Sequence, residues 1–128
     1  MRFLLDTHVF LWTLDDSPQL SRSAREVMTA TGTECLVSAV SFWEIAIKAG
    51  LRRKEFRVDA ARVIDAAHAA GLKHLPFLAA HAVRVARLPR HHADPFDRAL
   101  IAQALTEPLT LLTHDAALAR YGSAVRVV

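Results

Sequence analysis

The sequence predicts an α/β protein with three layers, in which helices cover both faces of a central, mostly parallel sheet. Three observations lead to this fold class. Short apolar segments alternate along the chain with segments of helical periodicity. The apolar segments have few polar positions, which is typical of strands buried on both faces. Acidic residues follow closely after two of them, where parallel strands open onto a crevice.

Length and composition indicate one globular domain over residues 1–128, with 52% hydrophobic and 23% charged residues. The apolar share is high for this size, which indicates surface buried against a second copy or a partner. The formal charge of +3 permits nucleic-acid binding without demonstrating it. No apolar run approaches ~20 residues, so no membrane span is expected. The single cysteine, Cys35, excludes an internal disulfide and favours a reducing, cytoplasmic location.

The first half of the chain predicts two strands and three helices. Asp15 to Pro18 break the first helix, Ser21 can cap the second, and Gly32 ends it. In order, the predicted elements are strand Arg2–Leu5, helix Thr7–Leu14, helix 21–31, strand Glu34–Ser38 and helix 41–53. The last of these helices is apolar on two sides, so we expect one side to meet the core and the other a partner.

A basic cluster lies at and beyond the end of that helix, made of Lys48, Arg52, Arg53, Lys54 and Arg57. Cations near the end of a helix are commonly solvated and favoured by its negative pole, so each has an ordinary structural explanation.

The second half repeats the alternation of helices and strands. Asp59 can cap its first helix, Gly71 closes that helix, and Pro108 precedes the next-to-last strand. The predicted elements are helix 59–70, strand 73–77, helix 78–86, loop 88–93, helix 95–106, strand 109–113, a turn of helix at 116–120 and strand 124–128.

The helix that starts at Pro95 carries a carboxylate in an unusual place. Asp94 followed by Pro95 is a typical helix start, because Asp accepts bonds from free N–H groups and Pro fits the first position. Asp97 then falls among the predicted apolar positions Phe96, Leu100, Ile101, Ala104 and Leu105. The predicted polar side holds Arg98, Ala102, Gln103 and Thr106. A charge on the buried side needs compensation. The positive end of the helix dipole is one such compensation, and a functional site is another.

Three more acidic residues fall where the crevice of a parallel sheet forms. Asp6 ends the first strand, Glu44 lies early in the helix after the second strand, and Asp115 follows the strand at 109–113. Each has a structural alternative: Asp6 can form an Asx-type turn, and Asp115 can cap the next helix. Glu44 can complete a capping box with Ser41 or pair with Lys48 one turn on.

Electrostatics favours cations among these carboxylates if they cluster. Two carboxylates ~5 Å apart repel by roughly 3 kcal/mol at an effective dielectric of ~20. Summed over every pair of four such groups, this rivals a domain stability of ~5–15 kcal/mol. Oxygen ligands select hard ions such as Mg²⁺ or Mn²⁺, which polarise phosphoryl oxygens and activate water. With a basic surface, this chemistry suggests phosphodiester hydrolysis.

Four segments together resemble the PIN-domain ribonucleases, and most of all the VapC-type toxins of bacterial toxin–antitoxin pairs. They are LLDTHVFLW at 4–12, SAVSFWEIAIK at 38–48, LPRHHADPFDRALIAQA at 88–104 and LLTHD at 111–115. The resemblance covers nearly the whole chain in order. It implies an acidic, metal-binding pocket of Asp6, Glu44, Asp97 and Asp115. It further implies RNA cleavage with Mg²⁺ or Mn²⁺ and an activated water, a homodimer, and inhibition by a cognate antitoxin.

The same resemblance suggests roles for residues around that pocket. Thr7 and Thr113 carry hydroxyls that often support such sites, although a Thr at a strand end is usually structural. Asp94 is either a peripheral ligand or, as we expect, the helix cap. His92 either touches phosphate or makes a loop hydrogen bond. We expect the basic side chains to hold the RNA backbone; the candidates are Lys48, Arg52 and Arg90.

Other functions are less consistent with the sequence. A phosphatase of the haloacid-dehalogenase type needs a second Asp two residues after the first, which Asp6-Thr7-His8 lacks. A receiver-like signalling domain needs a Lys after its last functional strand, and no Lys follows Lys73. The doublet His114-Asp115 lacks the partner histidines of helical HD phosphohydrolases. A non-enzymatic interaction module stays open if the acids are all helix caps.

Overall fold

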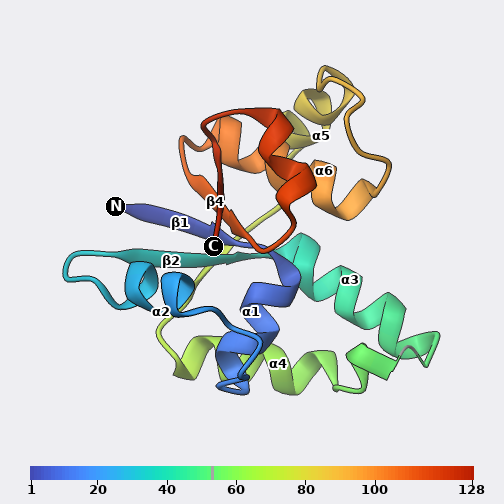
Figure 1. Ribbon diagram of the computed structural model, residues 1–128. Coiled ribbons are helices and arrows are strands. Elements are labelled where there is room, and N and C mark those ends of the chain that lie inside the picture. Colours follow the sequence, from blue (N-terminus) through green and yellow to red (C-terminus); the bar gives the residue numbers. More distant parts are fainter. Residues whose placement is uncertain (53) are drawn as a thin grey trace.

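Five parallel strands form the centre of the computed structural model, which describes residues 1–52 and 54–128 (Figure 1). The strand order is β3-β2-β1-β4-β5, and every neighbouring pair is parallel. The strands are β1 (Arg2–Leu5), β2 (Glu34–Ser38), β3 (Lys73–Leu75), β4 (Thr110–Thr113) and β5 (Val125–Val127). The predicted α/β class is therefore confirmed.

Helices cover both faces of the sheet, as predicted. Figure 1 shows α1 (Thr7–Leu14), α2 (Arg22–Thr29) and α4 (Ala60–Ala69) on one side, and α5 (Ala79–Ala86) and α6 (Pro95–Thr106) on the other. Alternate residues of a strand point to opposite faces. In β1, Phe3 and Leu5 accordingly join the core beneath α1, α2 and α4, whereas Leu4 joins the core beneath α5 and α6. This alternation produces the three layers.

The order of the strands places a crevice beside β1. The chain runs from β1 to β2 and β3 on one side, and then crosses to β4 and β5 on the other. Ligands bind at such a switch point, beyond the carboxyl ends of the strands. Leu5 pairs with Leu112, and the Asp6 N–H donates to the Leu112 carbonyl at 3.0 Å. The residues after β1 and after β4 are thereby brought together.

Helix α3 (Ala39–Gly50) starts earlier than predicted, directly after β2. The side chain of Ser38, the last residue of β2, accepts from the Val40 N–H at 3.0 Å and caps the helix. The predicted cap, Ser41, lies inside α3 and is buried. The predicted helix end at Arg53 lies outside the described residues. The short 3₁₀ segment η1 (Lys54–Phe56) leads on to α4.

The predicted polar side of α6 is partly wrong, because α6 packs against both the sheet and α5. Ala102 and Gln103 are fully buried. The Gln103 side chain binds the Ser38 hydroxyl and donates to the Pro76 carbonyl at 3.1 Å, so its polar atoms are satisfied. A second 3₁₀ segment, η2 (Ala116–Tyr121), connects β4 to β5. Within the described part of the chain, every helix is too short or too polar to span a bilayer.

Candidate active site

A pocket of about 410 Å³ lies at the carboxyl ends of β1 and β4, and we call it the acidic pocket. It brings together all four carboxylates that the sequence singled out, from four distant segments. The side chains that line it are Asp6, Thr7, His8, Glu44, Lys48, Asp94, Asp97, His114, Asp115 and Ala116.

Asp6 is one of the buried residues of the acidic pocket and is only 4% exposed. Its Oδ1 accepts from the Val9 N–H at 2.8 Å and so caps α1, while its Oδ2 accepts from the Thr113 hydroxyl. Burial raises the pKa of Asp6, and these hydrogen bonds offset part of that effect. Asp6 therefore caps α1 and lines the acidic pocket at the same time.

Glu44 reaches the pocket from the middle of α3 and is 3% exposed. Its Oε1 accepts from the Thr7 hydroxyl at 2.6 Å, and its Oε2 pairs with the Lys48 ammonium. The pairing with Lys48 at i, i+4 was one of the predicted alternatives and is confirmed. The capping box with Ser41 is wrong, because α3 starts at Ser38 and Glu44 is past its first turn. Glu44 is thus a buried carboxylate held by one hydroxyl and one cation.

Asp94 and Asp97 open α6 on the far wall of the acidic pocket. Asp94 accepts from the Phe96 and Asp97 N–H groups, at 2.8 and 3.2 Å, and is the helix cap that the sequence predicts. Asp97 projects from the first turn, with a quarter of its side chain exposed. Burial, followed by the charge of Asp94, raises the pKa of Asp97 to about 6, while the hydrogen bond with His92 opposes this. The charges of Asp6 and Glu44 act in the same direction as Asp94.

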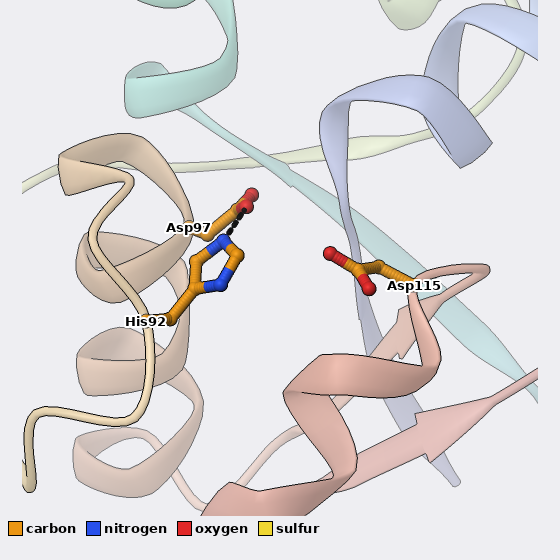
Figure 2. A group of neighbouring side chains, drawn as sticks. All are labelled: His92, Asp97 and Asp115. Carbon is orange, nitrogen blue, oxygen red and sulfur yellow. Dashed lines mark hydrogen bonds and ion pairs between the residues drawn. The ribbon is translucent and has the colours of Figure 1, made fainter.

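Asp115 faces Asp97 from the opposite side (Figure 2). Its Oδ1 accepts from the Ala117 N–H at 3.0 Å, so it also caps the next helix. His92 Nε2 lies 2.9 Å from Asp97 Oδ2. One ligand atom from each of His92, Asp97 and Asp115 lies within 4.8 Å of the others, a spacing at which all three can hold one metal ion. The sequence left two alternatives for His92, a phosphate contact or a loop hydrogen bond, and it gave no sign that His92 would approach Asp115.

The hydroxyls of two threonines form hydrogen bonds with the carboxylates of the acidic pocket. Thr7 Oγ1 lies between Glu44 and the Ser41 hydroxyl, which is 2.9 Å away. Thr113 donates to Asp6, and its oxygen accepts from the Asp115 N–H at 3.0 Å. Both threonines are buried. They fix the side chains of Asp6 and Glu44 in single orientations.

The basic side chains are divided among different places. Lys48 lies inside the acidic pocket. Arg90 and His92 line a neighbouring, larger pocket of about 630 Å³ with His91, Ala93 and Arg98. The Arg98 guanidinium donates to the Pro89 carbonyl at 2.9 Å and so holds this loop in place. Arg52 is exposed beyond the end of α3, outside both sets of lining residues.

Two histidines that line the acidic pocket were not predicted as site residues, His8 and His114. Each lies next to a predicted site residue in the sequence, at positions 8 and 114. Their proximity to a predicted acid was the one available signal, and it does not say where an imidazole points.

The fold is similar to that of chains in several solved toxin–antitoxin complexes. A chain in the crystal structure of VapBC2 from Rickettsia felis, bound to a promoter DNA fragment, matches with a TM-score of 0.71 at 16% identity, covering 100% of this chain and 98% of that one. A chain of DNA-bound VapBC from Salmonella typhimurium matches at 0.66 and 16% identity, covering 100% and 97%. A chain of VapBC-5 from Mycobacterium tuberculosis matches at 0.61 and 20% identity, covering 99% and 97%.

The sequence matches a protein family but no individual curated protein. The pattern of the PIN domain matches residues 3–124, which is nearly the whole chain, with Asp6, Glu44, Asp97 and Asp115 all inside the matched range. The chain therefore belongs to the PIN domain family.

Proposed function

We propose that this protein is a Mg²⁺- or Mn²⁺-dependent endoribonuclease and the toxin of a toxin–antitoxin pair. The observation that carries the proposal is the convergence of Asp6, Glu44, Asp97 and Asp115 in one pocket. Asp6 precedes α1, Glu44 lies in α3, Asp97 in α6, and Asp115 precedes η2, so long stretches of chain separate the four. Acids that served only as local caps would have no reason to share a pocket.

The donor set of the pocket suits a hard divalent cation. Most of the available ligand atoms are carboxylate oxygens, which Mg²⁺ and Mn²⁺ prefer, and His92 adds an imidazole that Mn²⁺ accepts more readily. In the proposal Asp6, Glu44, Asp97 and Asp115 together hold the ion, and Asp97 and Asp115 already have ligand atoms within 4.8 Å of one another. Such an ion, when bound, polarises the phosphate and lowers the pKa of a nearby water. Burial raises the pKa of Asp97 most, the charges of neighbouring carboxylates add to it, and a bound cation would oppose both effects.

The chain's own residues prepare the pocket for this chemistry. Thr7 and Thr113 orient the carboxylates of Glu44 and Asp6, so little reorganisation is needed when a ligand binds. Lys48 is paired with Glu44 at the wall of the pocket, where its ammonium can also attract a phosphate. Arg90 lines the adjoining pocket and is positioned to contact the RNA backbone farther along the strand.

The toxin role rests on the likeness to the toxin–antitoxin complexes and on the sequence motifs. VapBC-5 is described as a member of a family of toxin–antitoxin systems, and this chain has the same fold. We therefore propose a cognate antitoxin as a partner. A homodimer is proposed on the share of apolar residues, and two exposed apolar side chains support it, Trp43 on α3 and Leu51 directly after it.

The test is a cleavage assay on single-stranded RNA labelled at one end. We expect EDTA to stop cleavage, and Mg²⁺ or Mn²⁺ to restore it. Asp6→Asn and Asp97→Asn should each lower the rate by at least about 100-fold, because each removes a charged ligand. Asp65→Asn is the matched control, since Asp65 is exposed on α4, and it should retain full activity. Cleavage that persists in both site variants, or that resists EDTA, would count against the proposal.

A non-enzymatic interaction domain is the alternative, because Asp6, Asp94 and Asp115 do cap helices. The alternative predicts no specific binding of Mn²⁺. Calorimetric titration with Mn²⁺ separates the two, since a nuclease site should give one saturable binding event that Asp97→Asn weakens.

A further inference from the structure

Four rings form a continuous cluster beside the acidic pocket, and we call it the aromatic rim: His8, Trp12, Phe56 and His114. The His8 ring lies 5.7 Å from Trp12, 5.6 Å from Phe56 and 5.6 Å from His114, measured between ring centres. Trp12 and His114 are closer still, at 4.6 Å. Each pair is tilted or edge-to-face, the arrangement that aromatic rings favour.

The rim is anchored in the core and ends in solvent. Phe56 is 1% exposed, Trp12 and His8 are partly buried, and His114 is exposed. Trp12 also packs against the core on the α1 side of the sheet. The inner rings thus hold the outer imidazole in place at the mouth of the pocket, so a ligand would meet a surface that is already ordered.

The aromatic rim lies next to the carboxylates of the acidic pocket. His8 and His114 both line the acidic pocket. His114 directly precedes Asp115, so the rim lies on the Asp115 side, whereas His92 and Asp97 come from the other side (Figure 2). Lys48 connects the two features, because its ammonium pairs with Glu44 and lies 4.8 Å from the centre of the Phe56 ring.

The rim has no evident part in holding an ion. Among the described residues, the group with ligand atoms spaced for one ion is His92, Asp97 and Asp115, and it includes neither rim histidine. Flat rings beside a site for phosphate chemistry suit the base of a nucleotide rather than its phosphate. Proteins bind single-stranded nucleic acid by stacking bases on aromatic and histidine rings, because every base has a π-face.

We propose that the aromatic rim is a stacking site for the nucleobase of a nucleotide adjacent to the scissile phosphate. The inference rests on the proposed ribonuclease function and adds the way the RNA is oriented in the pocket. The base lies against His114 and Trp12 on the Asp115 side, and the phosphate lies over the carboxylates. The site recognises a base by its flat face and so requires an unpaired, unstacked nucleotide.

The experiment compares two probes with a fluorophore at one end. One is a single-stranded RNA hexamer, and the other is a chain of the same length built from abasic ribose phosphates. Every protein carries Asp97→Asn to prevent cleavage, and dissociation constants are measured with Mg²⁺ by fluorescence polarisation. The readout is the ratio of the two affinities, because a contact to phosphate or to a metal ion affects both probes equally, whereas stacking affects only the RNA.

We expect His114→Ala to lower the preference for RNA over the abasic chain by about 5- to 100-fold, the usual effect of losing one stacked base. Trp12→Leu should lower it as well. His68→Ala is the matched control, since His68 is an exposed histidine in the last turn of α4 and does not line the acidic pocket. It should leave the ratio of the two affinities unchanged. Because His114 is exposed, its substitution should not affect folding.

The outcomes distinguish this inference from the proposed function. If RNA still binds and the ratio is the same in the parent, His114→Ala and Trp12→Leu, the stacking site is refuted while the ribonuclease proposal stands. If this Asp97→Asn parent binds neither probe, the stacking site is refuted, and the cleavage assay of the wild-type protein decides the ribonuclease proposal. A loss of affinity for both probes by the same factor would assign the rim to the backbone or the ion, and would also overturn the inference.

Discussion

Replacing Asp97 by Asn should stabilise the protein when no metal is bound. The pKa of Asp97 is raised from 3.8 to about 6, chiefly by burial, so its ionisation in the folded state costs free energy. The folded state then binds more protons than the unfolded state between these two values. Stability therefore falls as the pH rises through this range. Asn keeps the shape and hydrogen-bonding capacity of Asp without the charge.

The size of the effect follows from the same values. The difference between 3.8 and about 6 corresponds to at most about 3 kcal/mol. Since 24% of the Asp97 side chain is exposed, screening by water reduces this to about 1–2 kcal/mol. The gain in the free energy of unfolding should be small near pH 4, where folded Asp97 is protonated and therefore neutral like Asn. It should be complete above about pH 7.

Urea unfolding in EDTA, measured at pH 4, 5.5 and 7.5, gives the free energy of unfolding of both proteins. Asp65→Asn is again the control and should stay within about 0.5 kcal/mol of the parent at each pH. With saturating Mg²⁺ the order should reverse, because only the parent keeps its full affinity for the ion. If Asp97→Asn is less stable than the parent in EDTA at pH 7.5, the electrostatic account of the pocket is wrong.

Three further predictions follow from the same structure. The cleavage rate should fall about tenfold for each pH unit below about pH 6, where Asp97 becomes protonated, and more Mg²⁺ should move this limb to lower pH; a flat profile between pH 4.5 and 7 would contradict it. Thr7→Val should weaken Mn²⁺ binding by about 10- to 100-fold in calorimetry, because Glu44 loses its hydroxyl donor, whereas Thr7→Ser should retain it. Gln103→Leu should lower the free energy of unfolding by about 1–3 kcal/mol in urea, since it leaves buried partners without bonds; Gln19→Leu, at an exposed position, should change it by less than about 0.5 kcal/mol.

The clearest error from the sequence concerns where α3 begins. Ser38 and Ser41 are both good capping residues, and the spacing from Ser41 to Glu44 matches a capping box. The structure uses Ser38, because Gln103 of α6 also binds its hydroxyl and β2 leads straight into the helix. A choice between two local signals was thus made by a contact from a distant helix.

The side of α6 that faces the core was hard to predict for a related reason. Periodicity assumes one buried face and one exposed face. Helix α6 is covered by the sheet and by α5, so Ala102 and Gln103 are buried as well. The polarity of Gln103 indicated an exposed position, but its partners in other elements satisfy it.

Local sequence determined the strands, most helix caps and the identity of the carboxylates, because apolar runs and Asp or Ser caps act within a few residues. The sequence also determined that Asp6 and Asp115 lie at the same edge of the sheet, since the carboxyl ends of parallel strands point in one direction. Only the tertiary structure brought His92 to Asp97 and towards Asp115, and packed His8 edge-to-face against His114. The reason is geometric: the direction of a side chain on a loop, and its distance from residues far along the chain, depend on how all the layers pack.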